Sequence, residues 1–232
     1  MMKKGFVDGI RATLPVSASV AAYGSVLGVL AAHKGVAWGV LMLMNVMVFA
    51  GSSQFVMLDM WNAPLPYAEM ALAVLVVNMR YLLAGASLEP LFRESSVARK
   101  LMSAHLVTDE SWAVTMVAWK RGEATVPYLV GGGLCVLTAW CAGTMVGEAF
   151  GSIVDNPEAL ALDFAFTAVF TALAVSLWRG RSDALPWIVA LAVSIISAQA
   201  LPGKWYIVVG AVAGALVAML MPEKEEGAHA TD

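Results

Sequence analysis

The stretch MALAVLVVNMRYLLAGASL, from Met70 to Leu88, decides the fold class of this chain. It is just long enough to cross a bilayer as a helix, and its one charged residue, Arg80, lies at its middle. A charge at the bilayer midplane costs about 2.5–3.5 kcal/mol on insertion scales, so such residues face a protein interior or a wet cavity and have a partner. The stretch therefore predicts a membrane-spanning segment with an ionic site inside the membrane.

The next hydrophobic segment, Leu101–Trp119, supplies candidate partners for this arginine, because Asp109 and Glu110 lie near its centre. With Thr108 and His105 they form a candidate proton relay, since His105 and Asp109 are one helical turn apart and can share a face. The same residues reduce the hydrophobicity of the segment. It is a full helix, a broken helix or a re-entrant segment buried in protein. If it emerges into water, these are ordinary surface charges.

The composition of the whole chain is typical of a membrane protein. Of its 232 residues, 60% are hydrophobic and 13% are charged, and the mean hydropathy is +0.76. It lacks the basic stripe of a nucleic-acid-binding protein. We predict an all-α, polytopic integral membrane bundle of seven or eight transmembrane segments. The predicted segments are residues 13–32, 36–58, 70–88, 101–119, 126–147, 160–178, 185–202 and 204–221.

The chain divides simply along its length. We expect residues 1–12 to be a basic cytoplasmic lead-in, residues 13–221 a single transmembrane domain, and residues 222–232 a short polar tail. The lead-in is like that of a signal peptide, but the apolar run after it is long enough to span rather than be cleaved.

The orientation of the segments is ambiguous. The basic lead-in favours a cytoplasmic N-terminus by the positive-inside rule, and Lys120 and Arg121 agree with it in an eight-segment arrangement. Arg93, Arg99 and Lys100 disagree, because eight full spans place them outside. A re-entrant fourth segment would bring them to the side of Lys120, but it would then place the N-terminus outside.

A faint internal repeat of about 119 residues is present. Gly24 and Gly28 match Gly143 and Gly147 at this spacing. Small residues four apart are common in membrane helices because they let backbones approach, so chance can also supply the match. A true duplication would favour transport, since transporters often bind substrate where two repeats meet.

Polar residues inside the second segment form a candidate binding site. Gly51, Ser52, Ser53 and Gln54 fall within one turn, where a local break would offer backbone donors and acceptors to a solute. The alternative is a close helix crossing in which the small residues allow contact and Gln54 bonds a neighbour. Asn78 is a further candidate, but it diverges from the central arginine by about 200° on a regular helix.

Arg80 is the strongest candidate, because a guanidinium offers a planar fork suited to a carboxylate. That carboxylate belongs either to a substrate or to a structural partner in the next segment. Asp163, a few residues into the sixth segment, is either an interfacial helix-start residue or a second intramembrane carboxylate.

Patterns of an enzyme are missing. The chain has no HExxH, GxSxG, phosphate-binding loop or CxxC motif, so we predict no enzymatic activity, no cofactor and no metal. Its two cysteines, Cys135 and Cys141, fall on different faces of one predicted helix and support neither a disulfide nor a metal pair.

Four motifs together resemble the AzlC family, the large subunit of two-component branched-chain amino acid exporters. The resemblance runs from about Gly5 to about Pro222. Tyr81 stands where the family pattern has a histidine, which puts a titrating role there in doubt. The motifs are Ala50-Gly51-Ser52-Ser53-Gln54-Phe55, Asn78-x-Arg80-x-Leu82-Leu83, Thr108-Asp109-Glu110-Ser111 and Leu162-Asp163-Phe164.

The resemblance implies export of leucine, isoleucine, valine and often methionine across the bacterial inner membrane. It also implies dependence on the proton motive force and a small membrane partner subunit of the AzlD type. The hypothesised substrate-binding residues are Gly51, Ser52, Ser53, Gln54, Asn78 and Arg80, and those for proton coupling are Asp109, Glu110 and Asp163.

Two other functions fit the same residues. A passive channel or facilitator needs a polar interior but no titrating acid. A structural membrane subunit would use the intramembrane charges only to hold helices together.

Overall fold

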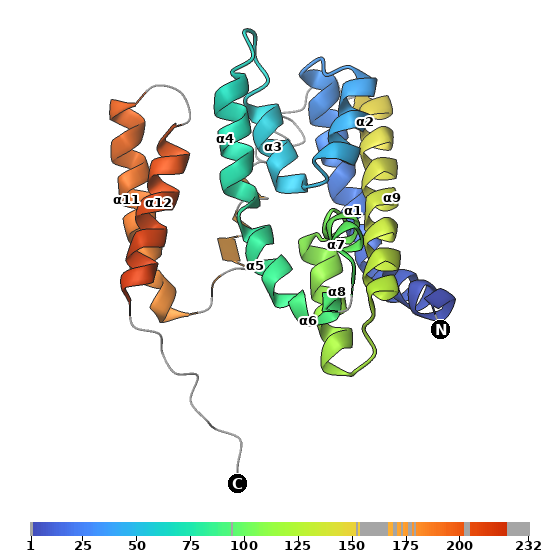
Figure 1. The fold of residues 1–232 in the computed structure, drawn as a ribbon. Coiled ribbons are helices and arrows are strands. Elements are labelled where there is room, and N and C mark those ends of the chain that lie inside the picture. Colours follow the sequence, from blue (N-terminus) through green and yellow to red (C-terminus); the bar gives the residue numbers. More distant parts are fainter. Residues whose placement is uncertain are drawn as a thin grey trace. The chain divides into compact units, whose positions relative to one another are not determined.

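The computed structural model describes residues 2–93, 95–151, 180–201 and 205–221, with positions 153, 167–168, 171–172, 174–175 and 178. Every regular element in these residues is a helix, which confirms the all-α prediction (Figure 1). The chain divides into two compact units. Unit 1 consists of Met1–Pro66 and Val77–Phe170, and unit 2 of Tyr67–Val76 and Thr171–Asp232.

The helices of unit 1 are α1 (Met2–His33), α2 (Trp38–Met47), α3 (Gly51–Asp59), α5 (Arg80–Ser87), α6 (Glu89–Phe92), α7 (Val97–Ala104), α8 (Asp109–Lys120) and α9 (Val126–Gly151). Those of unit 2 include α11 (Ala184–Ala200) and α12 (Trp205–Leu220), and the short 3-10 turn η3 (Arg181–Asp183) precedes α11. The helix α4 (Tyr67–Asn78) lies in unit 2 as far as Val76.

Four of the described helical stretches are long and apolar enough to cross a membrane: Lys4–His33, Tyr67–Ser87, Val126–Gly151 and Arg181–Ala200. They support the predicted class of integral membrane protein. A count of seven or eight segments stays a prediction, and most of the predicted segment 160–178 lies outside the described residues.

The helices α1 and α9 form the centre of unit 1 and lie side by side along their length (Figure 1). They run in the same direction, because Gly9 near the start of α1 packs on Tyr128, and Gly28 near its end packs on Thr144. A Cβ atom on Gly9 would overlap the carbonyl oxygen of Tyr128. Glycine is therefore required for this close approach of two backbones.

The four glycines that suggested a repeat all lie in this contact. Gly24 and Gly28 face α9, while Gly143 and Gly147 face α1. Mutual packing therefore explains their matching positions without a duplication. The second-half segment that would correspond to residues 36–58 lies largely outside the described residues, so the repeat stays a prediction.

The predicted segment 36–58 is not one continuous helix. It divides into α2 and α3, and Phe49 between them has a φ of 41°. This left-handed conformation is costly for a bulky residue and ends the helix. In Figure 1 the two helices form a hairpin that returns toward the end of unit 1 from which it came.

The segment 101–119 is also broken, which excludes one full helix and leaves a broken helix or a re-entrant segment. The chain leaves helical structure between His105 and Thr108, and α8 then begins at Asp109. The Thr108 side chain accepts a hydrogen bond from the Ser111 amide, and the Ser111 hydroxyl in turn accepts one from the Thr108 amide. This reciprocal cap fixes the start of α8.

The two hairpins meet at their tips. The pair α2–α3 follows the end of α1, whereas α7–α8 leads into the start of α9, so the hairpins enter unit 1 from opposite ends. At the meeting point His105 Nε2 lies 2.8 Å from the Val46 carbonyl oxygen. The ring of Phe49 lies 6.1 Å from that of His105. Interrupted helices of this kind are tolerated at membrane depth only where protein or a wet cavity surrounds the break.

Unit 2 is built on the packing of α11 against α12. Gly214 of α12 brings the backbones close, since a Cβ there would lie 2.9 Å from the Ala190 Cβ. Near the start of α11, the rings of Trp178 and Trp187 pack edge to face with centroids 5.1 Å apart. These small and aromatic contacts are typical of helix packing in lipid.

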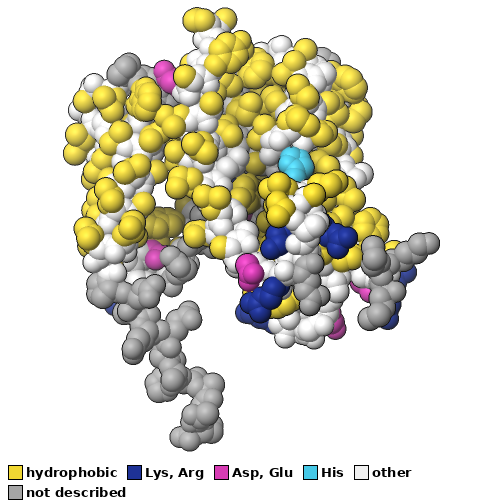
Figure 2. Space-filling view, in the orientation of Figure 1, with side chains coloured by type: hydrophobic (Ala, Val, Ile, Leu, Met, Phe, Trp, Pro, Cys, Tyr) yellow, Lys and Arg dark blue, Asp and Glu magenta, His cyan; other side chains and the backbone are white. Residues whose placement is uncertain are grey.

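Hydrophobic and charged side chains occupy different parts of the visible face (Figure 2). Hydrophobic side chains cover most of this face, and Lys and Arg side chains gather toward one end of unit 1. Many large apolar residues are exposed, among them Leu83 at 76% and Met219 at 81%. Such extensive apolar exposure is expected where lipid replaces water.

Candidate functional site

Arg80 lies where three helix interruptions converge. It is the first residue of α5, and its Nη2 atom donates to Ser52 Oγ at 2.7 Å and lies 3.1 Å from Asp109 Oδ2. The same nitrogen is 3.1 Å from the Tyr81 hydroxyl oxygen. The Arg80 side chain is 15% exposed and that of Asp109 is 46% exposed. An ion pair between Arg80 and Asp109, one of the alternatives drawn from the sequence, is thus present, and its carboxylate is half-exposed.

One nitrogen of this guanidinium is unsatisfied. Arg80 Nε is buried and has no hydrogen-bond partner among the described residues, although Nη2 has three. An unpaired buried donor is costly, so a group that pairs with it is favoured. Nε and Nη2 form one edge of the guanidinium, and a carboxylate can bind that edge with both oxygens.

Two helix N-termini lie beside the guanidinium. Ser52 belongs to the first turn of α3, and Asp109 is the first residue of α8. The first amides of a helix have no intrahelical acceptor and carry partial positive charge. Together with Arg80 they supply positive potential, which the carboxylates of Asp109 and Glu110 in the first turn of α8 offset.

Asn78 shares this site despite the divergence expected for a regular helix. Ser53 Oγ donates to Asn78 Oδ1 at 2.5 Å, so Asn78 and Arg80 hold adjacent serines of α3. The helix is interrupted at Met79, between the end of α4 and the start of α5. Both side chains reach α3 although Met79 between them keeps right-handed helical backbone angles, and a regular helical wheel does not predict this.

Gly51 and Gln54 have a different environment. A Cβ on Gly51 would lie 2.9 Å from Trp140 Cη2, so this glycine admits the indole ring. Gln54 is fully buried, donates to Asn45 Oδ1 at 2.8 Å and accepts from Trp140 Nε1 at 2.8 Å. Asn45 in turn donates to Thr144 Oγ1 at 2.6 Å. These contacts match the alternative of a close helix crossing, and they hold the α2–α3 hairpin against α9.

The sequence alone did not indicate three members of this network, which are Asn45, Trp140 and Thr144. Each is buried, with exposures of 0%, 3% and 0%. One signal in the sequence was available, because Asn45 is the only amide side chain in the apolar run from Val36 to Val48. A buried amide in a membrane segment requires partners, but the sequence does not say where they lie.

The remaining candidates lie apart from the guanidinium or outside the described residues. Glu110 is half-buried in the first turn of α8 and forms no salt bridge among the described residues. His105 does not share a helical face with Asp109, because the break before α8 directs it to Val46. Asp163 lies outside the described residues. Within the described part of the chain, no group of three His, Cys, Asp or Glu side chains could hold a metal ion.

Comparison with known proteins gives a consistent picture. The family model described as AzlC protein matches residues 15–154. The chain is 27% identical to the branched-chain amino acid transport protein AzlC of Bacillus subtilis over 92% of its length and 85% of that protein. It is 24% identical to the inner membrane protein YgaZ of Escherichia coli over 93% and 90% of the two chains. It is also 22% identical to an uncharacterized membrane protein of Helicobacter pylori over 96% and 97%. No solved structure matches the chain.

Proposed function

Because the chain belongs to the AzlC family, we propose that it is the large subunit of a secondary exporter of branched-chain amino acids in a bacterial inner membrane. The similarity to a branched-chain amino acid transport protein supports the substrate class. Methionine is included, since a pocket for flexible apolar side chains separates similar sizes weakly. One methylene is worth only about 1–3 kcal/mol.

The unsatisfied edge of Arg80 carries the proposal. Asp109 engages the guanidinium through Nη2 alone and is half-exposed, whereas Nε has no partner among the described residues. A substrate carboxylate that binds both Nε and Nη2 satisfies the buried donor as well. It therefore competes favourably with Asp109 for the arginine.

An amino acid is a zwitterion, so both of its charged groups find a partner in this site. As its carboxylate takes the place of Asp109 on Arg80, its ammonium group becomes the natural partner of the released Asp109 carboxylate. The salt bridge between Arg80 and Asp109 is exchanged for two salt bridges to the substrate. No net charge enters the site, which limits the cost of carrying the zwitterion through the membrane.

A proton then competes with the ammonium group for Asp109. Protonation from the outer side neutralises the carboxylate and removes its hold on the substrate, which leaves. When the proton passes to the inner side, Asp109 recovers its charge and the cycle can repeat. Inward proton movement is thereby linked to outward substrate movement, which is antiport driven by the proton motive force. Glu110 and Asp163 are the further candidates for this proton.

A small AzlD-type membrane subunit is proposed as partner. The described part of the chain leaves many apolar side chains exposed, which provides surface for another membrane helix as well as for lipid.

The test is export from cells loaded with dipeptides. Cells that lack their own exporters carry this chain with or without the small subunit, and intracellular and external amino acids are followed by mass spectrometry. We expect release of leucine, isoleucine, valine and methionine that needs both subunits and stops with an uncoupler. Lys100→Gln, a change of charge outside the site, should leave export unchanged. Release that survives the uncoupler would instead favour a passive facilitator, and no release with both proteins in the membrane would overturn the substrate class.

A further inference from the structure

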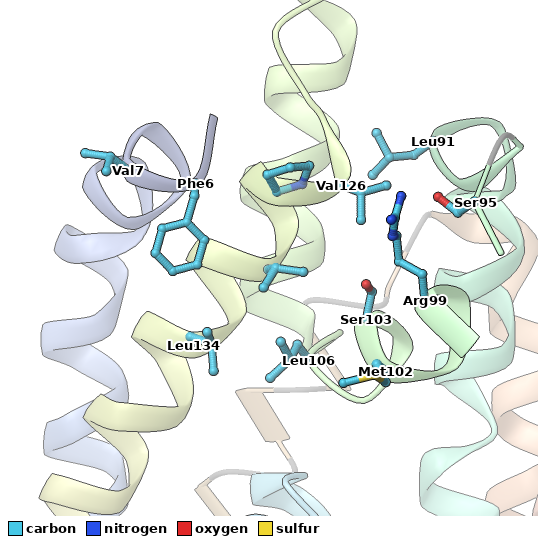
Figure 3. A pocket seen from close by; sticks show the side chains of 12 residues that line it. Phe6, Val7, Leu91, Ser95, Arg99, Met102, Ser103, Leu106, Val126 and Leu134 are labelled. Carbon is cyan, nitrogen blue, oxygen red and sulfur yellow. The ribbon is translucent and has the colours of Figure 1, made fainter. Parts of the chain in front are cut away.

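An apolar groove opens at one end of unit 1 (Figure 3), and Arg80 is not among the residues that line it. Its volume is about 1100 Å³, which exceeds the roughly 300–1,000 Å³ of a pocket for a drug-sized molecule. The start of α1, the start of α9 and the segment from α6 to α7 form its walls. Most of its lining is apolar, including Phe6, Leu91, Leu106, Val130 and Leu134.

The polar groups of the groove are few and lie at one side. They are the guanidinium of Arg99 and the hydroxyls of Ser95 and Ser103. Figure 3 shows the Arg99 side chain directed along the rim toward Val126, while Leu134 lies farther along the groove. The groove thus has a cationic rim and an apolar interior.

Arg99 differs from its basic neighbour Arg93. Arg93 Nη2 lies 3.6 Å from Glu89 Oε2, but Arg99 forms no salt bridge among the described residues. Because Arg99 is exposed at the rim, its charge is available to a ligand.

The groove lies where two candidate membrane spans begin. Both long helices that line it, α1 and α9, begin there, and each contains a candidate membrane span. The short helix α7 beside it exposes Val97 and Met102 at 72% and 75%. Apolar residues on one side and basic residues on the other are typical of a helix that lies in the interface.

We propose that this groove binds one anionic glycerophospholipid from the membrane. The phosphate pairs with Arg99 and the Ser95 and Ser103 hydroxyls, and an acyl chain follows Leu106 and Leu134 between α7 and α9. Charge complementarity selects this occupant, since the described part of the rim carries a cation without an acidic partner. Basic pockets between membrane helices recognise anionic headgroups in this way.

The experiment measures lipid retention by the full-length protein. The purified protein is exposed to dioleoyl phosphatidylglycerol or dioleoyl phosphatidylcholine, and bound lipid is counted by native mass spectrometry. We expect one phosphatidylglycerol to be retained in preference to phosphatidylcholine. Arg99→Gln should weaken its retention about tenfold, as expected for loss of a charge-assisted contact. Leu134→Trp should also weaken it by filling the path of the chain.

Matched variants make the result decisive. Lys100→Gln removes a neighbouring charge of the same helix that does not line the groove, and it should leave retention unchanged. Arg99→Lys should restore most of the preference. Equal retention of the two lipids would overturn the proposal, as would an equal loss in Lys100→Gln, which would indicate only a diffuse basic surface. Displacement of the lipid by inorganic phosphate would show that the headgroup is bound without the chain, contrary to the proposal.

Discussion

The pair α1–α9 and the hairpins α2–α3 and α7–α8 are built on opposite principles. The pair consists of two continuous helices in contact through glycines. The hairpins consist of short helices with breaks in the middle of unit 1. Uninterrupted helices give a rigid support that offers a solute little hydrogen bonding, whereas the breaks free backbone amides beside Arg80. The difference shows how one unit separates support from binding.

The largest effect on stability is expected from disrupting the contact between α1 and α9. Gly28→Leu places a side chain against the backbone of α9 near Thr144, where there is no room for a Cβ. We expect a loss of stability of about 3 kcal/mol or more, with little folded protein recovered. Fluorescence-detected size-exclusion chromatography and thermal denaturation measure this. Gly39→Leu is the matched control, because a Cβ at Gly39 has no heavy atom within 4 Å. Equal recovery of the two variants would contradict the role given to α1–α9.

The next effect is at the binding site. Arg80→Ala should lower export about 100-fold, since two charge-assisted hydrogen bonds to the substrate are lost. The support helices are untouched, so the variant should still reach the membrane. Initial export rates, normalised to protein level, check this.

A double variant separates binding from helix attachment. The double variant Arg80→Asp with Asp109→Arg exchanges the two charges. It restores the ion pair, but the groups that would bind the carboxylate and the ammonium of a zwitterion change places. We expect no recovery of export. Full recovery would mean that the pair serves only to hold helices together.

A more selective effect is expected from replacing Asp109, the acidic residue of the ion pair with Arg80. Asp109→Asn should abolish uphill export while exchange of labelled leucine across the membrane persists, because the substrate site remains and the proton carrier is lost. Glu110→Gln, one residue away and without a salt bridge in the described structure, is the comparison variant. Uphill export and exchange are both measured in membrane vesicles. Normal uphill export by Asp109→Asn would remove this residue from coupling.

The smallest effect on export is expected from cysteine substitutions that only report on which side of the membrane a residue lies. Arg93→Cys and Arg121→Cys, in a chain with Cys135 and Cys141 replaced by alanine, should react with a membrane-impermeant thiol reagent from the same, cytoplasmic, side. Eight full spans would place these two positions on opposite sides. Export should change little, because both arginines lie at the surface.

The described structure gives the reason for this expectation. Phe6, Arg99 and Val126 line one groove, so the basic lead-in, α7 and the start of α9 share one end of unit 1. The conflict found in the sequence depends on counting residues 36–58 as a full crossing. If both hairpins re-enter instead of crossing, these basic residues lie on one side, as the positive-inside rule requires.

The sequence predicted the helical class and gave Asp109, with Glu110, as a candidate partner for Arg80. These depend on composition and on the cost of a charge in lipid, which are local properties. A local break at Gly51–Gln54 was among the alternatives drawn from the sequence, and the structure has a break directly before it, at Phe49. That the chain turns back there was not predicted, since a hydrophobic run of span length gives the same signal whether it crosses or turns back. It also assigned Gln54 to the binding site, while the structure places it in a network with α9. That network depends on contacts between distant parts of the chain, which periodicity does not contain.

The hydrogen bonds that hold the α2–α3 hairpin also set an order for synthesis. Asn45 precedes its partner Thr144 by 99 positions, and Gln54 precedes Trp140 by 86. While the ribosome makes the intervening chain, these two amides have no partner from α9, and the hairpin tip is poorly suited to lipid. We therefore expect the hairpin to take its final place only after α9 enters the membrane. Chains that stop before α9 should be recognised as incomplete and degraded, although they already contain Arg80 and Asp109.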